Sequence, residues 1–360
     1  MKKKEKFLTL TSSLLSLPST KDNPKALKEV LKVAARELES YTIEWFEKDG
    51  TPSLLAYNSP TRPKRFKVIL NAHLDVVPGN PSQFKPKIKD GKLYGRGAYD
   101  MKGAAAVEIL VFKELAKKLP YPLGLQLVTD EEIGGFKGTK YQIEKGVRAD
   151  FVIAGEPTDL AVNNKAKGII WAKIYAFGKS SHGAYPWEGD NAILKLQKIL
   201  NELFKLYPLP QKEAWRTTIN LSRIEVENKT FNKVPDKAIA YLDIRYIPED
   251  KKKIKKDLER ICKKYGAKLE LLLNEPAQFT DQDNPYMKIL KKAIEKETGK
   301  KAKIIVKHGG SDIRHFNAVG CEGVTFGPTG AGLHTDEEWV EVKSLEVYGG
   351  ILKRFLNSIS

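Results

Sequence analysis

The stretch NAHLDVVPG, residues 71–79, follows directly on the apolar run FKVIL at residues 66–70. Such a run is typical of a buried strand, and side chains two residues apart on a strand lie on the same face. His73 and Asp75 are therefore expected to lie side by side where this strand ends. A histidine in that position can bind a metal ion while the neighbouring carboxylate fixes its tautomer and ring orientation.

Further acidic side chains follow strand-like or glycine-rich segments in the same way. Asp100 lies in the turn LYGRGAYDMKG before an alanine-rich segment, and Glu131 and Glu132 follow an apolar strand and precede two glycines. Glu156 follows another short strand, in AGEPT. Singly, each could be a helix cap or a solvated loop acid. Open α/β sheets place their sites where strands end, however, so we expect these carboxylates to converge.

The chain has only five histidines, and their positions favour function over structure. Besides His73, His334 lies in GPTGAGLHTDEE and His182 in GKSSHGAYP, both glycine-rich turns. His308 and His315 flank GGSDIR, and the sequence assigns neither a role. Histidines in such turns at strand ends are typical of functional sites. No H-E-x-x-H motif is present, which excludes a single-zinc protease of that kind.

The composition is that of a globular protein, with 41% hydrophobic and 30% charged residues over 360 positions, a length that favours two domains. No apolar stretch approaches the roughly 20 residues that span a bilayer. The leucines of MKKKEKFLTLTSSLLSLPST are interrupted by serine and threonine, which favours an amphipathic helix over a secretion signal. Two cysteines form no disulfide framework, so we expect a cytoplasmic protein without a membrane partner.

The net charge of +17 raises the question of nucleic-acid binding. Much of the excess lies in lysine runs at 251–253 and 255–256, interleaved with Ile254 and Leu258 as on the exposed face of an amphipathic helix. No nucleic-acid motif accompanies these runs, so we expect no nucleic-acid partner. A cationic surface can still attract small anionic substrates.

The order of expected elements predicts an α/β fold with a second unit inserted in it. Helices at 24–40 and 102–118 alternate with strands at 53–57, 66–70, 123–129 and 151–154, which favours a mostly parallel sheet covered by helices on both faces. Residues 169–273 then read strand, helix, strand, strand, helix, strand, a ferredoxin-like βαββαβ order. Helices at 285–298 and from 343, with strands at 302–307 and 323–326, return to the first pattern. The predicted domains are 1–166 with 278–360, and 167–277.

These segments, in this order, resemble the co-catalytic zinc amidohydrolases and peptidases that include acetylornithine deacetylase, succinyl-diaminopimelate desuccinylase, aminoacylase and the glutamate carboxypeptidases. The motifs that carry the resemblance run along essentially the whole chain: HLDVVP, YGRGAYDMKG, TDEEIGG, GEPT, SSHGAYP with DNAI, NKVP with DIR, and GPTGAGLH. The resemblance implies a zinc-peptidase catalytic domain with an inserted lid and dimerisation domain, two Zn²⁺ ions for which Co²⁺ or Mn²⁺ can substitute, and a homodimer formed through the lid.

The resemblance also implies roles for individual residues. One zinc ion would be bound by His73 and Glu156, the other by Glu132 and His334, and Asp100 would bridge the two. Asp75 would support His73 and Glu131 would act as general base and acid, with His182 donating to the developing oxyanion. Substrate contacts would come from Asn232, Arg245 and Arg314.

The implied reaction is hydrolysis of the amide bond of an N-acyl amino acid, in amino-acid biosynthesis. Glu156 favours the deacylase and carboxypeptidase branch over the tripeptide aminopeptidases, whereas the loop Ser311–Arg314 and the pair Lys167–Gly168 point to different acyl groups, so the acyl group stays open. A metallocarboxypeptidase or dipeptidase acting on small peptides is one alternative. An inactive zinc-holding binding protein is the other, and the presence of all five ligands and the base argues against it.

Overall fold

The computed structural model describes residues 3–359, which divide into two compact units. The first comprises residues up to 164, 279–305 and those from 311 onward, and the second comprises 165–278 and 306–310. Residues 306–310, which the sequence predicts in the first domain, group with the second unit. The reason is that His308 Nε2 lies 3.1 Å from Glu213 Oε1 and its ring packs against Trp215.

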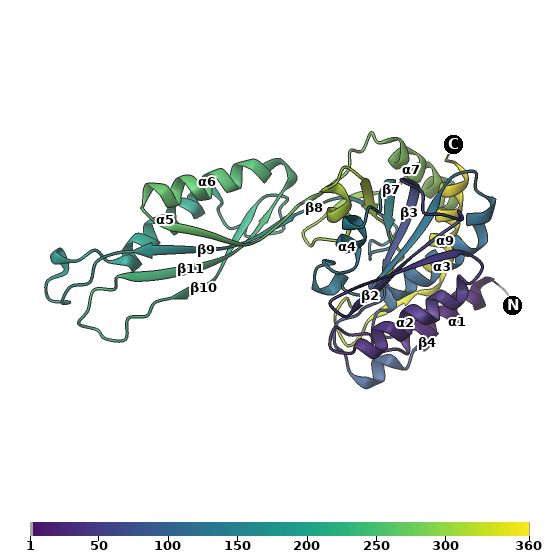
Figure 1. Cartoon of the computed structure of the whole chain (residues 1–360), viewed down its shortest axis with the longest axis horizontal. Coiled ribbons are helices and arrows are strands. Elements are labelled where there is room, and N and C mark those ends of the chain that lie inside the picture. The colour runs from purple at the N-terminus through teal and green to yellow at the C-terminus, as the bar shows by residue number, and fades with distance from the viewer. Residues whose placement is uncertain (1–2, 360) are drawn as a thin grey trace. The chain divides into compact units, whose positions relative to one another are not determined.

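A mixed sheet forms the centre of the first unit (Figure 1). Its strands in the described residues are β1 (Thr42–Lys48), β2 (Thr51–Tyr57), β3 (Phe66–His73), β6 (Leu123–Val128), β7 (Ala149–Ala154), β8 (Val162–Ala166), β13 (Gln278–Phe279), β14 (Ile304–Lys307) and β15 (Glu322–Thr325). They are ordered β1-β2-β6-β3-β7-β15-β8-β13, with β14 paired to β8. The central strands β6, β3, β7 and β15 run parallel, and antiparallel strands flank them on both sides.

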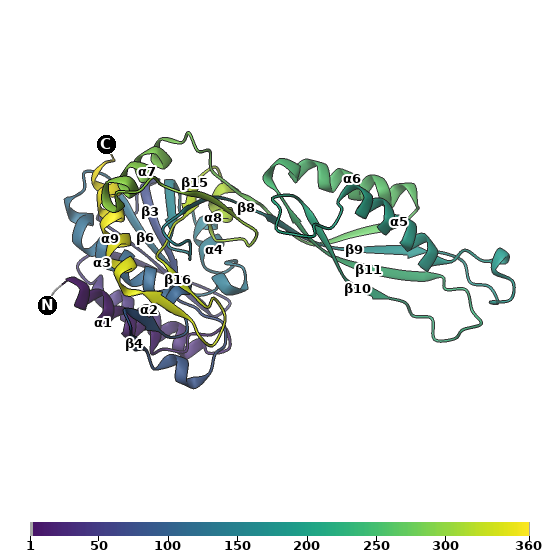
Figure 2. The ribbon, with the colours of Figure 1, turned by 180° about the vertical axis from the view of Figure 1, so that it is seen from behind.

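Helices cover both faces of this sheet, as the sequence predicts (Figures 1 and 2). On one face lie α1 (Lys3–Leu15), α2 (Pro24–Glu37), α3 (Gly103–Leu115), α7 (Pro285–Thr298) and α9 (Val342–Asn357). On the other lie α4 (Thr139–Glu144) and α8 (Ile313–Asn317). A small sheet of β4 (Lys87–Lys89), β5 (Lys92–Tyr94), β16 (Gly330–Ala331) and β17 (Trp339–Glu341) completes the unit. No helix within residues 3–359 is both long and apolar enough to cross a bilayer.

The second unit has the predicted βαββαβ order, in β9 (Gly168–Phe177), α5 (Ala192–Leu206), β10 (Thr218–Glu225), β11 (Lys237–Tyr246), α6 (Lys251–Lys264) and β12 (Lys268–Glu275). Its antiparallel sheet has the order β10-β11-β9-β12, and both helices pack on one face of it. On α6, Ile254, Leu258 and Ile261 are buried against the sheet while the lysines are exposed, which confirms the amphipathic helix.

One carboxyl group lies deep in the core of the first unit. Glu108 of α3 is fully buried, and its Oε1 accepts a hydrogen bond from the Tyr348 hydroxyl of α9 at 2.7 Å. Its Oε2 has no hydrogen-bond partner among the described residues. Burial raises the pKa of Glu108 well above its ordinary value of 4.5 and so favours its neutral form.

Glu108→Gln is expected to make unfolding less dependent on pH. Because folding raises the pKa of Glu108, the stabilisation present below about 4.5 in wild type is lost as pH rises toward the folded-state pKa, at up to about 1.4 kcal/mol per pH unit. The variant lacks this loss, so the difference in free energy of unfolding between the variant and wild type should shift in favour of the variant as pH rises from about 5 toward the folded-state pKa of Glu108, measured in urea titrations of metal-free protein. The exposed Glu114 of the same helix, changed to glutamine, is the control. A pH-independent difference between Glu108→Gln and wild type would contradict a neutral Glu108.

Candidate metal centre

The sheet order explains how residues far apart in the chain meet at one edge. Strand β3 lies between β6 and β7, and all three run parallel. His73 is the last residue of β3, Glu131 and Glu132 form a turn just after β6, and Glu156 follows β7. Parallel strands place their carboxyl ends at the same edge. The side chains that the sequence predicts to converge therefore do so.

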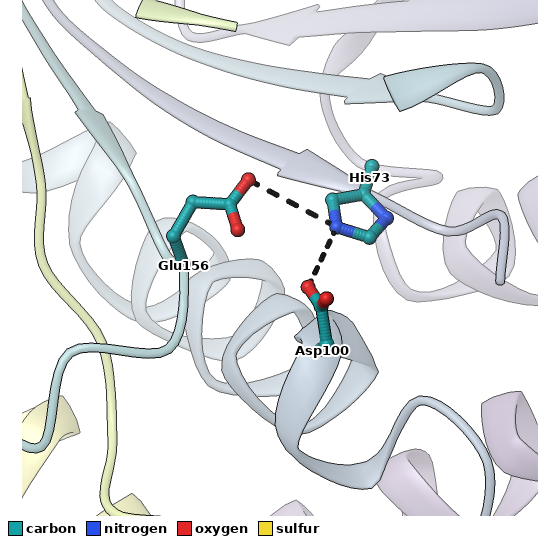
Figure 3. A group of neighbouring side chains, drawn as sticks. All are labelled: His73, Asp100 and Glu156. Atoms are coloured by element: carbon teal, nitrogen blue, oxygen red, sulfur yellow. Dashed lines mark hydrogen bonds and ion pairs between the residues drawn. The ribbon is translucent and has the colours of Figure 1, made fainter. Parts of the chain in front are cut away.

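His73 forms the first of two groups that could hold a cation. Its Nε2 lies 3.1 Å from Asp100 Oδ1 and 3.9 Å from Glu156 Oε1. Figure 3 shows both carboxylates pointing at the same ring nitrogen, one from the turn before α3 and one from the loop after β7. Imidazole nitrogen and carboxylate oxygen are the donors that zinc and related ions take in proteins.

The second group shares Asp100 with the first. Nε2 of His334, in the loop between β16 and β17, lies 3.3 Å from Asp100 Oδ2 and 3.2 Å from Glu132 Oε2. The donor atoms within each group lie within 4.8 Å of one another. Because Oδ1 of Asp100 faces His73 while Oδ2 faces His334, this one carboxylate is placed to bridge two cations.

Asp75 holds the neighbouring loop as well as the histidine. This residue is 2% exposed, and its Oδ1 and Oδ2 accept hydrogen bonds from the backbone N–H groups of Glu131 (3.3 Å) and Glu132 (3.0 Å). His73 Nδ1 lies 3.0 Å from the Asp75 carbonyl oxygen and 3.6 Å from its carboxylate. The ring is therefore oriented mainly by the backbone of Asp75, and the carboxylate fixes the turn that carries both glutamates.

The electrostatics of the two groups fit a pair of cations. Burial and the nearby Asp100 raise the pKa of Glu132 to about 8. Burial opposes ionisation of Asp100, but hydrogen bonds from His334 and His73 outweigh it and lower the pKa of Asp100. Hydrogen bonding to Asp100 raises the pKa of His334 to about 9. The two groups together place three carboxyl groups, those of Asp100, Glu132 and Glu156, against two imidazoles, and two divalent ions would compensate the charge of the ionised carboxylates.

Glu131 lies beside both groups and belongs to neither. Burial raises its pKa, and the positive charges of His73 and Arg314 oppose that rise. A carboxylate next to a metal site, with a pKa moved toward neutrality, can take and return a proton.

Side chains of α8 hydrogen-bond to the turn that follows Glu131. Arg314 is 4% exposed, and its Nη1 and Nη2 donate to the carbonyl oxygens of Ser311 (2.9 Å) and Gly134 (2.7 Å). His315 Nε2 donates to the same Gly134 carbonyl at 2.9 Å, and burial lowers the pKa of His315 to about 3. A Cβ on Gly135 would lie 2.0 Å from Asp312 Oδ1, so only glycine fits there. This geometry gives His315 and Arg314 a bracing role, and the contact of Arg314 with a substrate carboxylate stays a prediction.

The remaining predicted residues lie in the second unit. His182 is exposed in the loop after β9, where its Nδ1 accepts from Ala184 N at 3.1 Å, which places the proton of the neutral ring on Nε2. Asn232 lies next to it, since its carbonyl accepts from Gly183 N at 2.7 Å. Arg245 lies on β11, where its Nε donates to Asp243 at 3.0 Å. The structure therefore brings His182 and Asn232 together within this unit.

Sequence reasoning misses two features of the structure. Glu338, which is 2% exposed, accepts several hydrogen bonds from the turn that carries Asp100. Lys167 is 3% exposed, and its pKa is lowered by burial and by the charges of Arg216 and Arg245. The sequence does show a glutamate at 338, four residues after the predicted ligand His334. It cannot be told from the adjacent Glu337, however, which is exposed.

The fold and the paired ligand groups define a class of hydrolases, and comparison with known proteins identifies the family. The sequence model of peptidase family M20/M25/M40 matches residues 69–358 of this chain. Succinyl-diaminopimelate desuccinylase from Sphingopyxis alaskensis is 31% identical over 96% of this chain and 97% of its own length. The chain therefore belongs to peptidase family M20/M25/M40 and is a metal-dependent hydrolase that acts on amide bonds.

Solved structures share the fold over nearly the whole chain. Aminopeptidase PepT from Bacillus cereus superposes with a TM-score of 0.78 at 22% identity, covering 98% of both chains. An M20 metallo-carboxypeptidase from Sulfolobus solfataricus gives 0.74 at 19% identity over 99% of both. A dinuclear metal-binding M20 peptidase from Bacillus subtilis gives 0.71 at 15% identity, again over 99% of both. These likenesses confirm the predicted fold class.

Proposed function

We propose that this hydrolase removes the acyl group from an N-acyl amino acid, as a cytoplasmic enzyme of amino-acid biosynthesis. The observation that carries the proposal is the end-to-end similarity to a desuccinylase, together with two ligand groups that share Asp100. The cofactor would be two Zn²⁺ ions, since mixed imidazole and carboxylate donors suit zinc. One ion would be bound by His73 and Glu156, and the other by Glu132 and His334. Both ions would be bound by Asp100.

Bound divalent ions of this kind polarise a carbonyl oxygen and lower the pKa of water. Glu131 would take the proton from the attacking water onto its carboxylate and deliver it to the nitrogen of the departing amine. The burial that raises the pKa of Glu131 suits both halves of this task, because a carboxylate with a pKa nearer neutrality both accepts and releases a proton. Asp75 would keep Glu131 in place through its hydrogen bond to the Glu131 N–H.

His182 would donate from Nε2 to the oxygen on which negative charge develops, with Asn232 beside it. In the resembled family this donor comes from the partner subunit, so the proposal includes a homodimer formed by the second unit. Two observations support that surface. Strand β10 pairs only with β11 within the described residues, so one of its edges is open, and Tyr185, Trp187 and Phe231 are exposed.

The substrate would carry an anionic group that the second unit recognises. Lys167, Arg216 and Arg245 lie close enough for the two arginines to lower the pKa of the lysine. Arg245 is paired with Asp243 at 3.0 Å, and Lys167 and Arg216 add two further positive charges beside that pair. A substrate carboxylate would supply an opposing charge.

Lys167→Met is expected to raise KM for substrates that carry a carboxylate. Methionine keeps an unbranched side chain of nearly the same length and removes its charge. Loss of one charge-assisted hydrogen bond, about 1.5–3 kcal/mol, corresponds to roughly a 10- to 150-fold rise in KM. Steady-state kinetics with an N-acyl amino acid and with its carboxamide measure the effect, and the exposed Lys198→Met is the control. An equal loss on both substrates would contradict carboxylate recognition by Lys167.

A side-by-side assay tests the proposed function. Metal-free protein would be loaded with Zn²⁺, Co²⁺ or Mn²⁺ and offered N-succinyl-diaminopimelate, N-acetylornithine and a panel of dipeptides. We expect the acylated amino acids to be hydrolysed fastest and a chelator to abolish turnover reversibly. Faster dipeptide cleavage would replace the deacylase proposal with a carboxypeptidase or dipeptidase. Binding of two ions without hydrolysis of any substrate would support a binding protein.

A further inference from the structure

Glu338 lies beneath the shared ligand Asp100. It comes four residues after His334, immediately before β17, and its side chain is buried against the turn Gly95–Asp100. The backbone of the same residue also contacts this turn, since Gly95 N donates to the Glu338 carbonyl oxygen at 3.1 Å. One residue therefore connects the loop of His334 with the turn of Asp100.

Four hydrogen bonds converge on the Glu338 carboxylate. Oε1 accepts from the backbone N–H groups of Tyr99 (3.0 Å) and Asp100 (3.1 Å). Oε2 accepts from Gly97 N at 3.0 Å and from Arg96 Nη1 at 2.8 Å. A carboxylate has about four lone-pair positions, so this one is fully used by a single turn of the chain. The arrangement is a clamp on the backbone of Asp100.

We infer that Glu338 is a positioning residue, which holds the Asp100 carboxylate between His73 and His334 so that both cations can be bound. The inference rests on the proposed metal-dependent function. Asp100 Oδ1 lies 3.1 Å from the imidazole of His73, and Oδ2 lies 3.3 Å from that of His334. A shift of the Asp100 backbone would lengthen at least one of these distances. Glu338 touches neither candidate ligand group with its carboxylate oxygens except through the Asp100 N–H.

Glutamine cannot replace this carboxylate. An amide oxygen offers two lone pairs, and the amide nitrogen is a donor that would face N–H groups. In Glu338→Gln two of the four hydrogen bonds are therefore lost and the buried Arg96 guanidinium loses its ion-pair partner. The turn must then move to relieve the contact between donors, and Asp100 moves with it.

Loss of the Glu338 clamp should affect metal binding in a way that general destabilisation of the protein does not. Asp100 faces both ligand groups, so displacing it should weaken both bound ions together. Removal of His334 affects the second group alone. Changes in residues that orient metal ligands typically cost 10–100-fold in affinity.

The test compares metal binding by wild type, Glu338→Gln, His334→Ala and the exposed control Glu337→Gln. Metal-free proteins would be titrated with Zn²⁺ by calorimetry against a competing chelator, and with Co²⁺ by visible absorption. We expect about 10- to 100-fold weaker binding of both ions in Glu338→Gln, weakening of one ion in His334→Ala, and wild-type binding in Glu337→Gln. Turnover of Glu338→Gln should recover as Zn²⁺ is raised to saturation, which a misfolded protein would not show.

Wild-type affinity for both ions in a folded Glu338→Gln protein, or a loss confined to one ion, would overturn the inference. If that variant does not fold, Arg96→Gln removes one donor from the clamp and leaves the carboxylate in place. Weaker binding of both ions in folded Arg96→Gln then supports the clamp, and unchanged binding overturns it. Failure of wild type itself to bind two ions would instead overturn the proposed function.

Discussion

Glu131→Gln is expected to reduce kcat by about 10²- to 10⁴-fold, the usual contribution of a general acid–base group, with both metal ions still bound. Glutamine keeps the shape of the side chain and cannot take up a proton. Glu131 belongs to neither ligand group, and its backbone N–H, which anchors the turn to Asp75, is unchanged by the substitution. Stopped-flow or steady-state turnover, with metal content measured on the same sample, tests both parts of the expectation.

The matched control for this substitution is Glu144→Gln. Glu144 lies on α4 in the same unit, half-exposed, with an ion pair to Lys48 at 3.0 Å. It should leave kcat and metal content unchanged. A Glu131→Gln enzyme with near-wild-type kcat would remove Glu131 from the role of base, and loss of one metal ion in that variant would make it a ligand instead.

The sequence predicts the larger elements because their signals are local. The helix at 285–298 and the strands of the inserted unit lie within a few residues of their predicted ends, since amphipathic spacing and flanking glycine, proline or asparagine mark them. Asn284, for example, caps α7 by accepting from Tyr286 N. The sequence does not reveal β1 or the short strands β8 and β13 as sheet members, because their place depends on which partner lies beside them.

Some residues of the candidate site could likewise be predicted from local sequence, and others could not. His73, Glu132 and Glu156 could be placed from the sequence because each lies at or just after the end of a strand, and parallel strands have their carboxyl ends at the same edge of the sheet. The pairing of His334 with Glu132 depends on a loop more than 200 residues away in the chain, and only the resemblance to a family suggested it. Glu338 and the burial of Lys167 could not be predicted from the sequence, because burial is a property of the fold. A surface glutamate and a buried clamp look alike in sequence.

Asp100→Asn is expected to have the second large effect, the loss of both metal ions and with them of turnover. Asparagine removes a charge that two imidazoles share and leaves one oxygen where two are needed. The loss of affinity should exceed the roughly 100-fold limit typical of residues that only orient ligands, so saturating Zn²⁺ should not restore activity, in contrast to the recovery expected for Glu338→Gln.

Comparison of Asp100→Asn with Glu338→Gln distinguishes a residue that binds the metal ions from one that positions a ligand. The control for Asp100→Asn is Asp49→Asn, at a side chain that is 70% exposed, where metal content and kcat should stay at wild-type values. If Asp100→Asn retained one tightly bound ion, the carboxylate would serve a single group, and the common weakening expected of Glu338→Gln would lose its physical basis. If it retained both, the two groups would not be joined through Asp100 at all. Retention of neither ion is the result that a bridging carboxylate requires, because each cation then loses a negative ligand at the same moment.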